Sequence, residues 1–217
     1  MNAFNVRLCC IALLLFGWLL GSVSPAAGQT PPPTGDESPV LSVGKLVAGA
    51  ATALAMHEAG HLVFDAIFDA SPGVKKVSYA GIPFFAITHE PVSPVQEFAI
   101  SSAGFWVQHA TSEWLLTARP HLRREHAPFA KGVLAFNVLT SVVYAGAAMA
   151  RIGPLERDTR GIALSARIAE PWVGALVLAP AAFDAVRYVR PEWRAARWAS
   201  RAAKVAGVVL IIRAATR

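Results

Sequence analysis

The sequence is poor in charge and in cysteine, and each shortage excludes a class of protein. Only 16% of the 217 residues are charged, whereas 54% are hydrophobic; a soluble domain usually carries about 25% charged residues. The formal charge of +6 comes from arginines at the ends of apolar runs, without the basic clusters and stacking aromatics of a nucleic-acid-binding protein. The composition therefore predicts a membrane protein whose arginines meet lipid headgroups, and no nucleic-acid partner.

Both cysteines, Cys9 and Cys10, lie in an N-terminal apolar stretch. Residues 1–28 have the order of a secretory signal peptide, with Arg7 before an apolar core and small residues at its end. An uncleaved membrane anchor is the alternative. If the stretch is removed, neither a disulfide nor a cysteine-ligated metal is possible. The Pro-rich residues 29–40 then form a linker on the exported side.

Residues 41–217 are interpreted as one membrane-embedded domain. A helix needs about 20 apolar residues to cross the hydrocarbon core. A shorter fifth apolar segment near the C-terminus follows an Arg, Trp and Ala pattern that predicts a helix lying along the membrane surface. The expected fold is an all-α bundle of four or five apolar helices. Four of them are expected at about 41–68, 98–118, 132–150 and 171–189.

Between the first two apolar segments the sequence changes to β-branched and aromatic residues. VKKVSY (74–79) and FFAIT (84–88) predict two short strands joined around GIP, and hence a small β-hairpin after the first helix. Elsewhere, the Gly and Ala runs at 47–55 and 144–150 are interpreted as places where helices pack closely.

The expected localisation is the bacterial inner (cytoplasmic) membrane. Lys75 and Lys76 lie between the first and second apolar segments, while Arg119, Arg123 and Arg124 lie between the second and third. If the linker is outside and every segment spans, this distribution opposes the positive-inside rule. Either one segment is therefore re-entrant or the last is not a span, and the face on which a site opens is left undecided.

The first apolar segment contains HEAGH at residues 57–61, which matches the HExxH pattern. On a helix, residues i and i+4 lie on one face, so His57 and His61 can both reach one Zn²⁺. Glu58 stands beside the metal, where it can take a proton from metal-bound water. Asp65, one further turn along, is expected to hold an imidazole N–H or to end the helix. Ionisable groups are expensive in hydrocarbon, and a zinc site explains why they are there.

These residues resemble the site-2 protease family of membrane-embedded zinc metalloproteases. HEAGHLVFDAIF (57–68) is similar to the family's first motif, and GVKKVSYAGIPFF (73–85) to the β-rich stretch that follows it. SAGFWVQH (102–109) shares the Ala-Gly core of the next motif without its proline. FNVL (136–139) resembles the asparagine part of the last motif. The resemblance covers about residues 45–160.

The resemblance implies a hydrolase that carries out intramembrane proteolysis, with a third zinc ligand from a leucine-aspartate-glycine motif. No such motif follows Asn137 at the expected distance, and the nearest acidic residue is Asp158. The order of motifs favours Asp158 as the third ligand, although its flanking arginines also fit a solvated, salt-bridged loop. In the family the asparagine is expected to hold a substrate carbonyl. From the residues alone, Asn137 could equally hydrogen-bond a neighbouring helix.

Two other carboxylates compete with Asp158 for the role of third ligand. Glu113 lies one turn after His109 on the second apolar segment, and both are unusual in a membrane helix. Asp184 could be a ligand or could pair with Arg187 three residues later. The missing proline and aspartate motif also fit a non-catalytic membrane scaffold or chaperone with a metal-stabilised helix pair. A membrane metalloenzyme of another specificity is a third hypothesis.

Overall fold

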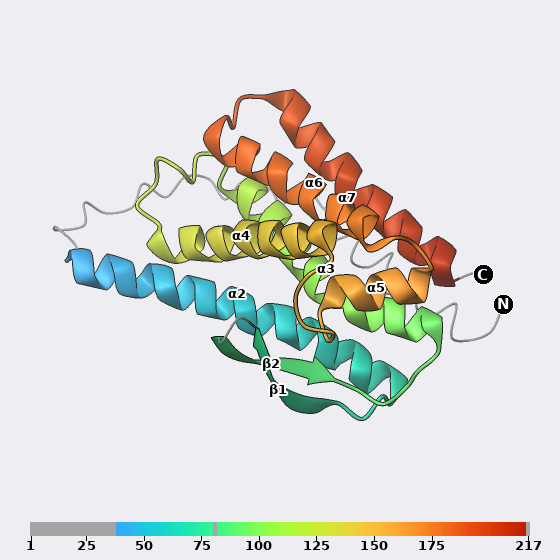
Figure 1. Ribbon diagram of the computed structural model, residues 1–217. Coiled ribbons are helices and arrows are strands. Elements are labelled where there is room, and N and C mark those ends of the chain that lie inside the picture. Colours follow the sequence, from blue (N-terminus) through green and yellow to red (C-terminus); the bar gives the residue numbers. More distant parts are fainter. Residues whose placement is uncertain (1–37, 80–81, 216–217) are drawn as a thin grey trace.

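The computed structural model describes residues 38–79 and 82–215. This part of the chain forms six helices and one two-stranded hairpin (Figure 1), so a mostly helical fold with a small hairpin is confirmed. The predicted signal peptide at 1–28, and the linker up to residue 37, lie outside the described residues.

The described elements have the following bounds. The long helices are α2 (Pro39–Phe68), α3 (Pro94–Ala118), α4 (Pro128–Ala150), α6 (Glu170–Val189) and α7 (Arg194–Ala215). The short elements are β1 (Gly73–Tyr79), β2 (Ile82–Thr88) and α5 (Asp158–Ala166). Each of α2, α3, α4 and α6 has a proline in its first turn, where the missing N–H would have no partner within the helix.

Three of the described helices, α2, α4 and α6, are long and apolar enough to cross a membrane. Helix α3, which covers the expected segment 98–118, is not among them. It is instead the central helix of the bundle and buries most of its length. A capping box closes its start, because Ser93 and Gln96 satisfy each other's backbone N–H groups.

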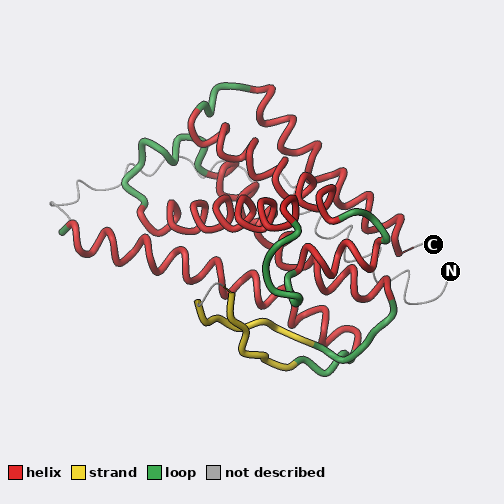
Figure 2. The backbone as a smooth tube through the Cα atoms, in the orientation of Figure 1, coloured by secondary structure: helices red, strands yellow, loops and turns green. Residues whose placement is uncertain are grey.

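The helices pack so that the chain passes back and forth through the bundle. Helix α2 packs against α4 and α3, α4 packs against α6, and α7 lies on α6. Figure 2 shows the hairpin beside the C-terminal half of α2, and β2 contacts that helix. The strands are antiparallel, with Gly73 opposite Thr88 and Tyr79 opposite Ile82. The hairpin, the start of α3 and α5 therefore gather at the end of the bundle where α2 finishes.

Helices α2 and α4 touch along a pair of glycines. A Cβ on Gly49 would lie 2.0 Å from the carbonyl oxygen of Phe129, and a Cβ on Gly132 would lie 2.0 Å from that of Leu46. The predicted close packing at 47–55 is thus confirmed. At 144–150 it is confirmed for Ala145 and Ala148, because a Cβ on Gly174 of α6 would lie 2.9 and 3.1 Å from their atoms; it is wrong for Gly146, whose Cβ would meet nothing within 4 Å.

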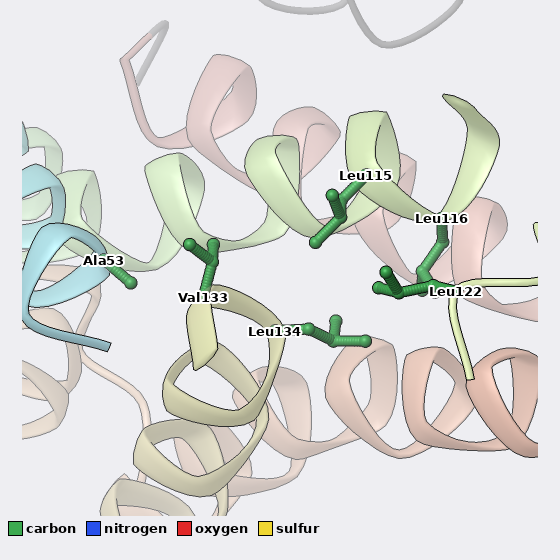
Figure 3. Close-up of a cluster of buried hydrophobic side chains, with 6 residues drawn as sticks. All are labelled: Ala53, Leu115, Leu116, Leu122, Val133 and Leu134. Atoms are coloured by element: carbon green, nitrogen blue, oxygen red, sulfur yellow. The ribbon is translucent and has the colours of Figure 1, made fainter. Parts of the chain in front are cut away.

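An apolar cluster between α2, α3 and α4 lies next to this contact (Figure 3). It includes Ala53 of α2 and Leu122 of the loop after α3, which is completely buried. Burial of such side chains is the main favourable contribution to folding. The other members are Leu115, Leu116, Val133 and Leu134.

Two elements differ from the expectation. Residues 158–166 form helix α5 rather than a solvated loop, and an acidic residue in the first turn favours a helix there because it faces the positive end of the helix dipole. The C-terminal segments form one continuous helix, α7. Trp198 is exposed while Ser200 and Lys204 are buried, so one side of α7 packs against the bundle; its place along the membrane surface stays a prediction.

Candidate metal centre

Three predicted site residues, His57, His61 and Asp158, come together where α2 approaches the start of α5. His57 Nε2 lies 3.1 Å from Asp158 Oδ2 and 3.3 Å from His61 Nε2. His61 Nε2 lies 3.6 Å from the same carboxylate oxygen. One ligand atom from each residue is within 4.8 Å of the other two. The group could therefore hold a metal ion.

The histidines meet because α2 is regular through this region, which stacks residues four apart on one face. Both rings are buried, with exposures of 2% and 5% for His57 and His61. A polar group taken out of water needs a partner, and here each imidazole faces the other imidazole and one carboxylate. This donor set, two nitrogens and an oxygen, is one that zinc accepts.

Asp158 is placed by its neighbours in sequence. Arg157 makes a bidentate ion pair with Glu170 at the start of α6, at 2.6 and 2.7 Å, and Thr159 donates a hydrogen bond to the same carboxylate. The flanking arginine is therefore engaged with Glu170, and the expectation of a salt-bridged loop around Asp158 is wrong. Both sides of Asp158 are anchored to α6, which directs its carboxylate toward α2.

Burial acts to raise the pKa of Asp158, but the charges and hydrogen bonds of His61 and His57 outweigh it. The pKa is consequently held well below its usual range. The carboxyl is an anion at neutral pH, which is the form that ligates a metal.

The outer nitrogen of His61 is also fixed. Its Nδ1 lies 2.7 Å from the carbonyl oxygen of Ile100, so the Nδ1–H donates to that carbonyl and Nε2 keeps its lone pair. Asp65 was expected to hold an imidazole or to end the helix. It holds no imidazole: it is fully buried, and its carboxylate oxygens have no hydrogen-bond partner among the described residues. It does lie at the helix end, in the last turn of α2, where its carbonyl oxygen accepts the N–H of the C-cap residue Asp69.

The Ala103–Gly104 pair lies where α3 crosses the two histidines. A Cβ on Gly104 would fall 2.4 Å from the ring of His57, and a Cβ on Gly60 would fall 3.0 Å from the carbonyl oxygen of Ala103. Only a residue without a side chain leaves room for the ring at position 104. Phe105 stands edge-on to His57 at a ring separation of 5.6 Å, so the imidazole is held on this side.

Glu58 follows His57 on α2 and is half-buried. Its charge interacts with those of His57, His61 and Asp158, so it lies beside the group without being one of its three members. This is the position expected for a base that acts on a ligand of the metal.

Glu113 and Asp184, the competing candidates, belong to a different cluster. Glu113 accepts hydrogen bonds from both Nη groups of Arg187. Its carboxylate oxygens also lie 2.9 Å from Arg201 Nε and from Lys204 Nζ. Asp184 accepts from Lys204 at 2.9 Å and from Arg187, the pairing expected from its sequence spacing. We call these five residues the ion network. Sequence reasoning found only the pairing of Asp184 with Arg187 and missed the rest, because Arg201 and Lys204 come from α7, which was expected at the surface.

Asn137 lies buried on α4, where its side-chain NH₂ donates to the Gln108 carbonyl and to Ser112 Oγ at 3.1 and 3.0 Å. The amide therefore joins α4 to α3, as one of its two interpretations expected. The other, a contact with a substrate carbonyl, stays a prediction that none of its contacts supports.

A cavity of about 430 Å³ opens onto the group. Its wall includes His61, Asp158 and the end of β2 at Ile87 and Thr88. Lys75 of β1 bridges the hairpin to Glu156, two residues before Asp158, at 2.5 Å. We call this space the site cavity; it connects His61 and Asp158 with the hairpin.

Comparison of the chain with protein-family models, with curated proteins and with solved structures finds no match.

Proposed function

We propose that the chain is a membrane-embedded zinc metallopeptidase that hydrolyses peptide bonds of membrane proteins or membrane-proximal segments. The observation that carries the proposal is the meeting of both HExxH histidines with Asp158, which is 101 residues from His57 in sequence. Two imidazoles and a carboxylate are a ligand set of catalytic zinc sites, which keep a fourth position for water or substrate. The resemblance to the site-2 protease family points to the same activity.

His57, His61 and Asp158 would hold the metal. Bound zinc would supply Lewis acidity and lower the pKa of a water to about 7. Glu58 would act as the base toward such a water and as the acid toward the leaving amine, because it directly follows one ligand and lies beside all three. The Ile100 carbonyl keeps His61 in the tautomer that ligates through Nε2.

The hairpin supplies a place for the substrate. A helix within a bilayer satisfies its own backbone, so it must open before a peptide bond can be attacked. An extended segment could add to an edge of the β1–β2 hairpin through backbone hydrogen bonds. Because the site cavity runs from Ile87 and Thr88 to His61 and Asp158, such a segment would lead its scissile carbonyl toward the metal.

The test replaces the proposed base while leaving the ligands unchanged. Membranes of cells that make wild-type protein or Glu58→Gln are compared for new protein N-termini by mass spectrometry, and Glu90→Gln is the matched control. Glu58→Gln is expected to retain metal and to lower cleavage by a factor of about 10² or more. Unchanged cleavage in this variant would refute the proposed role of Glu58.

A second candidate is a non-catalytic scaffold or chaperone in which the metal holds α2 to α5. It is favoured by two departures from the family pattern: the proline missing from 102–109 and the aspartate motif missing after Asn137. A scaffold would keep its cellular phenotype in Glu58→Gln and lose it in His57→Ala. A peptidase would lose it in both.

A further inference from the structure

A second and larger cavity lies between α3, α5, α6 and α7. Its volume is about 740 Å³, within the range of roughly 300–1,000 Å³ that small-molecule sites occupy. We call it the lateral cavity. Its walls are mainly apolar and come from all four helices, for example Phe98, Phe105, Ile162, Val173, Val177 and Leu210.

The lateral cavity is long. On α3 its wall extends from Pro94 to His109, a distance of about 22 Å at the rise of an α-helix. One leaflet of a bilayer has a hydrocarbon thickness of about 15 Å, half of the whole core. The cavity is therefore long enough for an acyl chain.

Positive charge is concentrated at one end of the lateral cavity. Arg167, at the C-cap of α5, and Arg213, in the last turn of α7, both line it, and both are exposed. A guanidinium binds phosphate oxygens through two parallel hydrogen bonds. This end therefore suits an anionic group in contact with solvent.

The inner end of the lateral cavity is lined by two polar residues, Lys204 and His109, but neither presents a charge to the cavity. Lys204 directs its ammonium to Glu113 and Asp184 at 2.9 Å, so its aliphatic stem lines the space. Burial, followed by the neighbouring Lys204, lowers the pKa of His109 to about 3. His109 is therefore uncharged at neutral pH, and the cavity accepts an apolar chain along most of its length.

We propose that the lateral cavity binds one acyl chain of an anionic phospholipid, with the phosphate between Arg167 and Arg213. The bilayer that α2, α4 and α6 could span provides such lipids. A substrate helix fits less well: a helix about 10 Å across fills roughly 420 Å³ per turn, so the cavity would hold fewer than two turns. None of His57, His61 and Asp158 lines the lateral cavity, so the lipid site is separate from them and does not depend on peptidase activity.

The test measures lipid binding to the purified full chain. Delipidated protein is titrated with phosphatidylglycerol or phosphatidylcholine, and bound lipid is counted by native mass spectrometry. We expect phosphatidylglycerol to bind more tightly, and each arginine to contribute about fivefold in affinity, the effect of one cation near an anionic lipid surface. Equal binding of the two lipids would overturn the proposal, because it would indicate general contact with the bilayer.

Two kinds of variant locate the bound lipid. Arg167→Gln with Arg213→Gln should remove most of the preference for phosphatidylglycerol, whereas Arg124→Gln with Arg194→Gln, which loses equal charge elsewhere, should not. Ala203→Phe, which fills part of the cavity, should reduce binding of the acyl chain itself. Unfolding temperature and zinc content show that each variant is folded. Wild-type binding by folded Ala203→Phe, or equal losses in both double variants, would place the lipid elsewhere.

Discussion

Two clusters of buried ionisable side chains lie in the same helical bundle, and their partners differ. In the ion network, Glu113 and Asp184 are each contacted by Arg187 and Lys204. In the metal group, which is His57, His61 and Asp158, two ring nitrogens and a carboxylate oxygen face one another. The first cluster contains its own counter-charges, whereas the second is a set of donors around a common point.

The partners of each cluster show which buried charges hold helices together and which could bind an ion. Burying a charge is costly unless a partner compensates for it. The ion network meets this condition with residues of α3, α6 and α7, and so joins these helices. In the metal group, two imidazoles contact one carboxylate. A bound divalent cation would give all three side chains a partner. Glu113 and Asp158 are both carboxylates inside the bundle, and their partners separate them.

Breaking the ion network should have the largest effect on stability. In Arg187→Met, both Glu113 and Asp184 lose a buried cation, so the free energy of unfolding should fall by about 3–5 kcal/mol. Denaturant unfolding in detergent measures it, with the exposed Arg190→Met as control. Zinc per folded chain should stay at the wild-type value. If Arg187→Met loses zinc while remaining stable, the two clusters are not independent.

A smaller effect is expected from crowding the metal group. In Gly104→Ala the new methyl carbon would lie 2.4 Å from the His57 ring, so the ring must move. We expect a loss of about 1–3 kcal/mol in stability together with weaker zinc binding. Gly146→Ala on α4, whose Cβ meets nothing within 4 Å, should be neutral or slightly stabilising. Competition with a chelator measures zinc affinity, and equal affinity in both variants would contradict the assigned contact.

The smallest effect is expected at an exposed ion pair. Lys75→Met removes the partner of Glu156 and should cost at most about 1 kcal/mol, because Lys75 is largely in water. The Lys75 hydrogen bond lowers the pKa of Glu156. The contribution of this ion pair to stability is therefore fully present above the ordinary pKa of a glutamate. It is lost as the pH falls through the lowered pKa of Glu156.

Thermal unfolding at several pH values measures the Lys75 effect. The difference between wild type and Lys75→Met should vanish in acid, and Lys76→Met, on the other face of β1, should show none. A difference that persists at low pH would mean that Lys75 acts through something other than this pair.

Local patterns in the sequence predicted much of the fold. The HExxH face required only the i, i+4 geometry of one helix. The hairpin was predicted from β-branched and aromatic residues, and the helices from the length of the apolar segments. The spacing of His57 and His61 is therefore visible in five residues. The bundle order and the burial of α3 are tertiary properties that such patterns do not contain.

The rest of the candidate site depends on contacts between distant segments. Asp158 reaches His57 only because Glu170 holds the residues on either side of it, and no spacing in the sequence encodes that. The cations that engage Glu113 are 74–91 residues away. For Asn137, sequence left two roles, and the position of α3 explains the hydrogen bonds that it makes.

The central claim is that His57, His61 and Asp158 together bind a divalent metal, and zinc analysis with X-ray absorption on the purified full chain tests it most directly. Wild-type protein and Asp184→Asn are expected to bind zinc through nitrogen and oxygen ligands at about 2.0–2.2 Å. Asp158→Asn is expected to bind it far more weakly. Wild-type zinc affinity and an unchanged ligand shell in Asp158→Asn would contradict the account.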